Sequence, residues 1–211
     1  MEFKHEPVLL NEVLQWLDPA PGGVFADGTL GGGGHSQRIL ERIGDSGALY
    51  GIDRDEDALR AATQRLQGFS TFHAIHGNFH DVNRLLPEGM LLDGGLLDLG
   101  VSSYQLDTPE RGFSYHEDAP LEQALDDWMA RIRPGGRLCV ITFHSIEDRI
   151  VKHAFRRMQN PCTCPPQAPI CTCGKKPVAK VMGGGAIRPT QEETLRNPRA
   201  HSATLRVAQK L

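Results

Sequence analysis

Short apolar runs alternate with helix-like patterns along most of this chain. The runs predict buried strands at Val24–Ala26, Ala48–Ile52, Thr71–Ile75, the segment that ends in Gly95–Asp98, and Arg137–Phe143. Between them, apolar residues recur at the spacing of one helix face over Ser36–Ile43, Glu56–Leu66 and Leu121–Ile132. A further helix is expected to follow the fifth strand, with Ser145 as its cap and Asp148 completing a capping box.

This regular order of strands and helices predicts an α/β fold with a mostly parallel sheet and helices on both faces. Ala203–Ala208 alternates as a final strand, and Val178–Met182 is the segment that can pair with it in the antiparallel sense. Two stretches interrupt the order. Residues 99–120 form a long loop rich in turn-forming residues, and residues 160–200 form a basic excursion rich in Pro, Gly and Cys.

Length and composition favour one globular domain. The chain has 211 residues, of which 39% are hydrophobic, and a formal net charge of −3. No segment approaches the roughly 20 apolar residues that cross a membrane, and the first residues lack the pattern of a secretory signal. We therefore expect a cytoplasmic protein with no membrane contact, in which five cysteines are thiols or metal ligands. The pattern does not set an oligomeric state.

The small net charge conceals two oppositely charged parts. Residues 1–130 hold 8 basic and 22 acidic residues, whereas residues 131–211 hold 15 basic and 4 acidic ones. A basic final third on an acidic body fits a polyanionic partner such as a nucleic acid. Two halves that simply pack together would give the same counts, so charge alone leaves both interpretations open.

A glycine-rich segment after the first strand is the strongest local signal. It runs from Asp27 to His35 and leads into a helix, so a ligand can approach its backbone closely. Asp53 ends the second strand, where Rossmann-like folds place an acceptor for ribose hydroxyls. The glycine spacing does not fit a dinucleotide fingerprint or a P-loop. Asp27 would repel a pyrophosphate but suits a cationic ligand such as S-adenosylmethionine; a connector that binds nothing is the plain alternative.

Three other residues at strand ends are candidates for chemistry. Asp98 ends the fourth strand on the same edge and can accept hydrogen bonds from a substrate amino group, or it can make local turn bonds. Phe79 follows the third strand, where an aromatic ring either stacks on an adenine or fills the core. His144, after the fifth strand, is a plausible lining residue; His144 and Ser145 as neighbours do not form a hydrolytic triad.

Four cysteines lie close together in the basic excursion, namely Cys162, Cys164, Cys171 and Cys173. Four thiols in one short stretch suit tetrahedral zinc, although Cys-x-Cys is tighter than the usual ligand spacing. A structural metal and free thiols in a flexible loop both remain open, and no metal ligand is assigned. Cys139 lies within a strand and is simplest to interpret as a buried apolar residue.

Taken together, these motifs identify a resemblance. The chain is similar to the bacterial 16S ribosomal RNA cytosine-N4 methyltransferase family, from end to end and in order. The stretches that carry the resemblance are His5–Leu10, Asp27–Ser36, Gly77–Phe79, Asp98–Ser103, Gln105–Asp107, Arg111–Tyr115, Phe143–Arg149 and Asn197–Ala200.

The resemblance implies a class I methyltransferase fold, S-adenosylmethionine as methyl donor and a cytidine in the decoding region of 16S rRNA as substrate. The family's cofactor residues fall on Gly33, Gly34, His35, Asp53, Phe79, Asp98 and Gln105. Asp98 is also the expected catalytic acceptor of the cytosine amino N–H, with His144 as a weaker candidate beside it. The 99–118 loop is expected to form part of a pocket for an unpaired or flipped base, with Tyr104, Phe113 and Tyr115 as stacking surfaces.

One departure from the family is large. A helical domain that the family inserts after the Ala-Pro-Leu at 119–121 is absent, and the chain passes directly into the next helix. A non-catalytic cofactor-binding or RNA-binding remnant is therefore an alternative to the enzyme. An NAD-type oxidoreductase is a third possibility, against which the glycine spacing and the lack of a Tyr-x-x-x-Lys pair argue.

Overall fold

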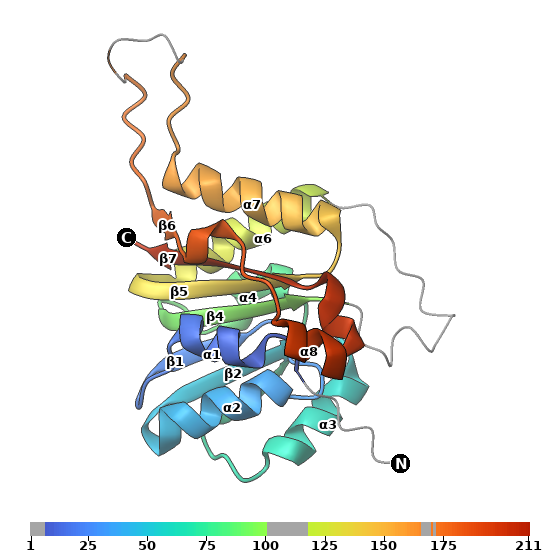
Figure 1. Cartoon of the computed structure of the whole chain (residues 1–211). Helices are drawn as coiled ribbons and strands as arrows, with labels where there is room; N and C mark the ends of the chain where they lie inside the picture. Colours follow the sequence, from blue (N-terminus) through green and yellow to red (C-terminus); the bar gives the residue numbers. More distant parts are fainter. Residues whose placement is uncertain (1–6, 101–117, 166–169, 171) are drawn as a thin grey trace.

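The fold is built on one twisted sheet. In the computed structural model, which describes residues 7–100, 118–165, 170 and 172–211, the strand order is β3-β2-β1-β4-β5-β7-β6 (Figure 1). The strands are β1 (Val24–Asp27), β2 (Ala48–Asp53), β3 (Phe72–His76), β4 (Leu92–Leu99), β5 (Ile132–Thr142), β6 (Ala179–Val181) and β7 (Thr204–Lys210). β1 to β5 pair in parallel, whereas β7 runs antiparallel to both β5 and β6. The predicted fold class, including the antiparallel final strand, is confirmed.

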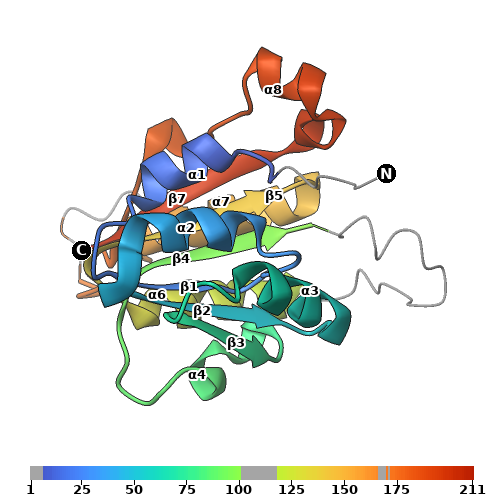
Figure 2. The same ribbon diagram turned by 90° about the horizontal axis from the view of Figure 1, so that it is seen from below.

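Helices cover both faces of the sheet (Figure 2). The α-helices are α1 (Leu10–Leu17), α2 (Gly34–Ile43), α3 (Glu56–Leu66), α4 (Val82–Leu85), α6 (Asp118–Arg131), α7 (Ser145–Gln159) and α8 (Gln191–Arg196). Short 3-10 turns are η1 (Gly44–Ser46), η2 (Phe79–Asp81), η3 (Gly183–Gly185) and η4 (Pro198–Ser202). α1, α2 and α3 bury their apolar faces in one core, and α4, α6 and α7 do so in the other. None of the described helices is long and apolar enough to cross a membrane.

The two cores explain why the apolar runs form strands. In the centre of β5, Leu138 to Ile141 are fully buried, because helices cover the sheet on both sides there. Trp128 of α6 is also fully buried, and its indole Nε1 donates to the Phe79 carbonyl at 2.9 Å. α3 begins after Asp55, whose carboxylate accepts a hydrogen bond from the Asp57 N–H at 2.9 Å. Propensity, capping and burial therefore agree on these elements.

The capping box expected at the start of α7 is wrong. The residue before the helix is His144, which makes no side-chain cap hydrogen bond, and Ser145 is already the first helical residue. The Asp148 carboxylate instead binds the Arg206 guanidinium of β7, with both nitrogen–oxygen distances at 2.8 Å. Arg206 is only 8% exposed, and a buried charge without a partner costs more free energy than an uncapped helix end. The Asp148 carboxylate therefore pairs with Arg206 and does not cap α7.

Candidate active site

Carboxylates gather at the edge of the sheet where the parallel strands end. Asp27 and Asp53 are the last residues of β1 and β2, and Asp98 is the next-to-last residue of β4. Because these neighbouring strands run in the same direction, their carboxyl ends meet at one edge, the usual ligand edge of open α/β sheets. The structure therefore brings the three predicted acidic residues together.

Asp27 lies underneath the glycine-rich segment. Its carboxylate accepts hydrogen bonds from the Ser36 hydroxyl at 2.7 Å and from the Thr29 N–H at 3.1 Å. Burial raises the pKa of Asp27 to about 6, and the charge of Asp53 adds to the rise, against the hydrogen bonds that lower it. The side chain is 2% exposed. Asp27 thus fixes the segment from inside, and it contributes negative charge to the site from below.

The glycine-rich segment folds back over the ends of β1 and β2. Gly31 and Gly33 have positive φ angles of 49° and 75°, which favour glycine. The Gly31 N–H donates to one Asp53 carboxylate oxygen at 2.8 Å, and the Asp55 N–H donates to the other at 2.9 Å. Asp53 therefore already holds the segment in place, while each of its oxygens keeps a lone pair for a further donor.

Close packing surrounds the start of α2. A Cβ on Gly34 would lie 2.6 Å from the Pro7 side chain, so only glycine fits there. His35 is 7% exposed, and its Nε2 lies 3.8 Å from a carboxylate oxygen of Asp98. His35 thus lies beside Asp98, and Gly33 and Gly34 come directly before it in the chain.

Asp98 lies at the centre of the arrangement. Its backbone N–H donates to the Thr29 hydroxyl at 2.6 Å, which links the end of β4 to the glycine-rich segment. The carboxylate Oδ1 is buried and has no hydrogen-bond partner among the described residues. Burial raises the pKa of Asp98 to about 7, and the negative charges of Asp27 and Glu147 raise it further. A buried acceptor without a donor is suited to a ligand that brings one.

Glu147 is a site residue to which the sequence reasoning gave no role. It lies in the first turn of α7, and its Oε2 is buried without a hydrogen-bond partner among the described residues. Burial raises the pKa of Glu147, against lowering effects of the His144 charge and of backbone hydrogen bonds from His144 and Phe143. The only sequence signal was its place in the Phe143–Arg149 stretch, next to the His144 that drew attention instead.

Phe79 lies on the neighbouring side, in η2 just after β3. It is partly buried against the core that contains Trp128. A Cβ on Gly28 would lie 3.0 Å from the Phe79 Cβ, so the ring borders the start of the glycine-rich segment. His144 is exposed at the start of α7, near Glu147. Gln105 lies outside the described residues, as do Tyr104, Phe113 and Tyr115.

Sequence comparisons decide the family of the chain. Residues 2–126 and 120–211 match the MraW methylase family. The chain belongs to the MraW methylase family. A relative in Trichlorobacter lovleyi, named ribosomal RNA small subunit methyltransferase H, is 39% identical over 310 residues, with 100% of this chain and 99% of the relative covered. A relative of the same name in Clostridium botulinum is 34% identical over 309 residues, with all of both chains covered.

The fold of this MraW family member is that of other methyltransferases. A SAM-dependent O-methyltransferase from Thermotoga maritima superposes with a TM-score of 0.63 at 14% identity, with 100% of this chain and 68% of that chain covered. At that identity the likeness concerns the fold alone. The alignments to the relatives are longer than the 211 residues of this chain, so a domain-sized part of each relative has no counterpart here.

Proposed function

We propose that this chain transfers a methyl group from S-adenosylmethionine to N4 of a cytidine in 16S rRNA. Family membership and the names of the relatives support the class of reaction. The observation that carries the proposal to particular atoms is the buried Asp98 Oδ1, an acceptor that lacks a donor at the carboxyl edge of the sheet.

The residues at this edge suit the methyl donor. Asp27, Asp53, Asp98 and Glu147 form one acidic group in which neighbouring charges raise the pKa of Asp27 and Asp98. Such a group favours a ligand with positive charge over an anionic one such as a pyrophosphate. S-Adenosylmethionine, when bound, supplies an electrophilic methyl group on a cationic sulfur. Gly33, Gly34 and His35 would border it, with Asp53 accepting from the ribose and Phe79 beside the adenine.

Asp98 is the proposed acceptor for the substrate. The cytosine amino nitrogen is a weak nucleophile because its lone pair is delocalised into the ring. A carboxylate that accepts its N–H orients the nitrogen and stabilises the positive charge that develops on it. The Thr29 hydroxyl holds the Asp98 backbone, and the packed strand holds its position. We assign this role to Oδ1, the atom that the described residues leave without a donor.

Glu147 is the proposed second carboxylate of the reaction. The charge of Glu147 raises the pKa of Asp98, and burial raises the pKa of Glu147, so both groups hold a proton to a higher pH than usual. After methylation the cytosine nitrogen carries an extra proton, and this pair is placed to receive it. His144, whose charge opposes the rise in the pKa of Glu147, would then tune how readily the pair accepts that proton.

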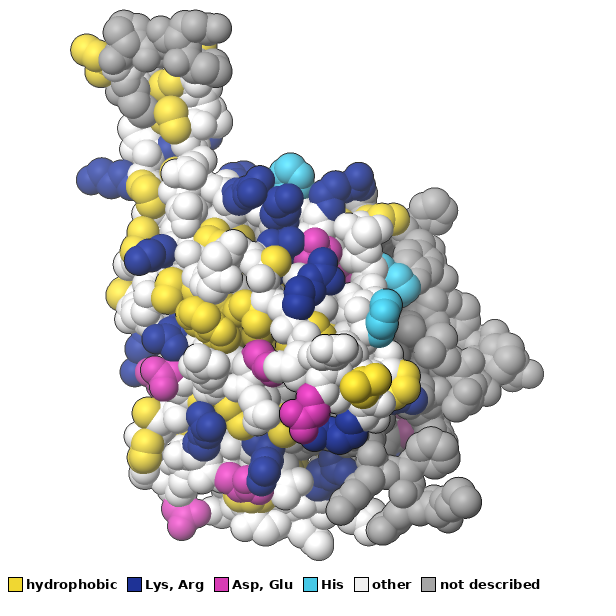
Figure 3. Space-filling model, in the orientation of Figure 1, with side chains coloured by type: hydrophobic (Ala, Val, Ile, Leu, Met, Phe, Trp, Pro, Cys, Tyr) yellow, Lys and Arg dark blue, Asp and Glu magenta, His cyan; other side chains and the backbone are white. Residues whose placement is uncertain are grey.

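A basic surface over α7, the helix that also carries Glu147, supports an RNA substrate. Lys and Arg side chains gather over the end of the molecule formed by α7 (Figure 3). Lys152, Arg156 and Arg206 line a hollow of about 220 Å³ together with the glycines of η3. Backbone N–H groups and cationic side chains such as Lys152 and Arg156 position RNA phosphates without reading sequence. We infer that this face meets the rRNA backbone while the carboxylates meet the base.

The test is methylation of small ribosomal subunits that lack the modification, with labelled S-adenosylmethionine. We expect N4-methylcytidine in digested 16S rRNA, identified by mass spectrometry. Asp98→Asn should abolish most of it while leaving RNA affinity close to wild type, because the hydrogen bond tightens in the transition state. Tight RNA binding without any methylated product would contradict the proposal and favour a non-catalytic remnant. Binding of NAD instead of S-adenosylmethionine in a thermal-shift comparison would favour an oxidoreductase.

A further inference from the structure

An arm projects from the body between α7 and β6 (Figure 1). It comprises residues 160–178, and its described part contains neither a helix nor a strand. No described residue from 161 to 178 is buried, and Ile170 is 74% exposed. The described residues of the arm therefore form no apolar core that could hold its two limbs together.

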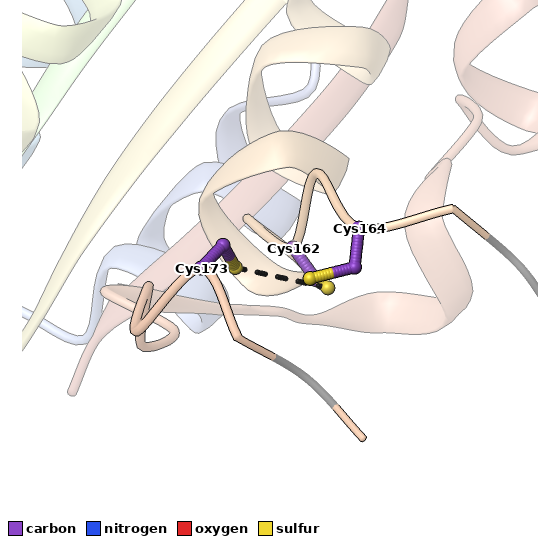
Figure 4. A group of neighbouring side chains, drawn as sticks. All are labelled: Cys162, Cys164 and Cys173. Carbon is purple, nitrogen blue, oxygen red and sulfur yellow. Dashed lines mark hydrogen bonds between the residues drawn. The ribbon is translucent and has the colours of Figure 1, made fainter. Parts of the chain in front are cut away.

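Thiols from both limbs meet inside this arm. Cys162 and Cys164 lie on the limb that leaves α7, and Cys173 lies on the limb that returns to β6. Their sulfur atoms all lie within 4.8 Å of one another, and the side chains point toward a common centre (Figure 4). The Thr172 N–H also points at the Cys164 sulfur, at 3.4 Å.

The spacing of the sulfurs fits a shared metal ion. The Cys162 and Cys173 sulfurs are 3.8 Å apart. That is far beyond the disulfide bond length of about 2.05 Å. With zinc–sulfur bonds of about 2.3 Å, two thiolates of a tetrahedral site lie about 3.8 Å apart. We propose that the arm binds one Zn²⁺ ion through Cys162, Cys164 and Cys173.

The surroundings favour this site in two ways. Each thiol must lose its proton to coordinate the metal, and a backbone N–H such as that of Thr172 stabilises the thiolate that results. Lys175 and Lys176 follow Cys173 after a single residue, Gly174, and offset the negative charge of a thiolate-rich site. Since none of the described residues from 161 to 178 is buried, metal binding would supply folding free energy that apolar burial there does not.

The metal site is independent of the proposed function. α7 begins beside Glu147 and ends at Gln159, where the arm starts, so its length separates the arm from the carboxylates by about 20 Å. The buried Cys139 in β5 is not part of it, and burial raises the pKa of that thiol to about 12. Failure of the zinc proposal would leave the methylation proposal untouched, and the reverse is also true.

The decisive measurement is the zinc content of the full chain, purified without an affinity tag from zinc-supplemented medium. We expect about one zinc per chain after gel filtration, by plasma mass spectrometry. Cys162→Ser and Cys173→Ser should each lose most of it, whereas Cys139→Ala, the control that removes a thiol from the core, should keep it. A metal-free wild type, or undiminished zinc in both arm variants, would overturn the proposal.

A second measurement reads the ligands directly. Co²⁺ added to metal-free chain should give the intense absorption of tetrahedral cobalt thiolate, and Zn²⁺ should remove it. Cys171→Ser, at a position outside the described residues, belongs in the series to test whether a fourth thiol contributes. Circular dichroism of the arm variants should match wild type, because the described arm buries no residue. An octahedral cobalt spectrum, or an intact mass two hydrogens short from a disulfide, would contradict the site.

Discussion

At the scale of single residues, the site depends on carboxylates that the fold holds close together despite the repulsion between their charges. Asp98 feels this charge repulsion most strongly. Its neighbours Asp27 and Glu147 carry the same charge, and its Oδ1 has no hydrogen-bond donor among the described residues. A methyl donor with a cationic sulfur relieves that repulsion when it binds. The same repulsion makes the stability of the protein depend on pH.

Asp98→Asn should change how stability depends on pH. The folded pKa of Asp98 is about 7, above its usual 3.8, so its favourable contribution is present below pH 3.8 and is lost as pH rises through about 7. An asparagine side chain cannot ionise, so the Asp98→Asn variant does not lose this stability. Relative to wild type, its free energy of unfolding should rise by roughly 2 kcal/mol between about pH 5 and pH 8, on the basis of about 1.4 kcal/mol per pKa unit. This difference in free energy is set below the full value for the pKa shift because the Asp98 side chain is 28% exposed and partly screened by water.

Thermal unfolding of the two proteins at both pH values checks this prediction. Asp45→Asn, at an exposed position before β2, is the control and should track wild type at each pH. A stability difference between Asp98→Asn and wild type that is the same at both pH values would contradict the raised pKa.

Asp53→Ala should weaken S-adenosylmethionine binding by roughly 1.5–3 kcal/mol, the value of charge-assisted hydrogen bonds to ribose. The loss includes the hydrogen bond that holds Gly31 in the glycine-rich segment. Calorimetry of the purified chain measures the affinity directly. Asp45→Ala makes the same change near the other end of the same strand and should bind normally. Unchanged affinity in Asp53→Ala would place the adenosine elsewhere.

At the scale of elements, α7 links the site to the far strand β7. Its first turn places Glu147 at the site, and its next residue, Asp148, binds Arg206 of β7. Burial raises the pKa of Asp148, but the hydrogen bonds and charge of Arg206 outweigh it and hold the pKa below its usual value. The position of Glu147 therefore depends on an ion pair between elements distant in sequence.

Arg206→Lys should destabilise the fold by roughly 1–3 kcal/mol, because an ammonium cannot reproduce two parallel bonds to one carboxylate. The control is Arg157→Lys, since Arg157 also contacts both oxygens of a carboxylate, that of Asp126, but at an exposed position. That change should cost less than about 1 kcal/mol. Urea unfolding measures both, and equal losses in the two variants would show that burial of the Arg206 pair contributes nothing.

The same elements show what sequence could and could not predict. Asp27, Asp53 and Asp98 were predicted to share an edge because parallel strands must end together, which needs no knowledge of packing. The fate of Asp148 could not be predicted, because its partner Arg206 lies 58 residues away and local capping rules do not see it. Helix α1 was not predicted either. The cysteine spacing left zinc and free thiols undecided, because it does not say whether the two limbs of the arm bring the thiols together.

At the scale of the whole molecule, this chain keeps the sheet and its carboxyl edge but is shorter than its relatives. The family matches end and begin again within residues 120–126, at the start of α6. In the aligned relatives a domain-sized segment has no counterpart here. We propose that the missing segment grips rRNA over the site, and that the sheet alone holds the methyl donor.

This division of labour predicts S-adenosylmethionine binding similar to that of the Trichlorobacter lovleyi relative but much slower methylation of small subunits. RNA binding should remain, because residues 131–211 hold 15 basic and 4 acidic residues, and should weaken steeply with salt. Side-by-side calorimetry, filter binding and single-turnover assays measure the three quantities. An intact mass that exceeds 23.2 kDa by the mass of a domain would show that the segment is not missing from this protein. Equal single-turnover rates would show that the segment is dispensable.

The antiparallel strand β7 also constrains how the protein is made. β5 is central to the sheet, yet Thr142 at its end meets Thr204 of β7 only after 62 more residues. At about 5–20 residues per second, a ribosome needs roughly 3–12 seconds to supply them. Until then Cys139 and Ile141 belong to an uncovered apolar edge, open to other chains. The cysteine arm emerges within that interval, so the proposed zinc site would be complete before the sheet closes.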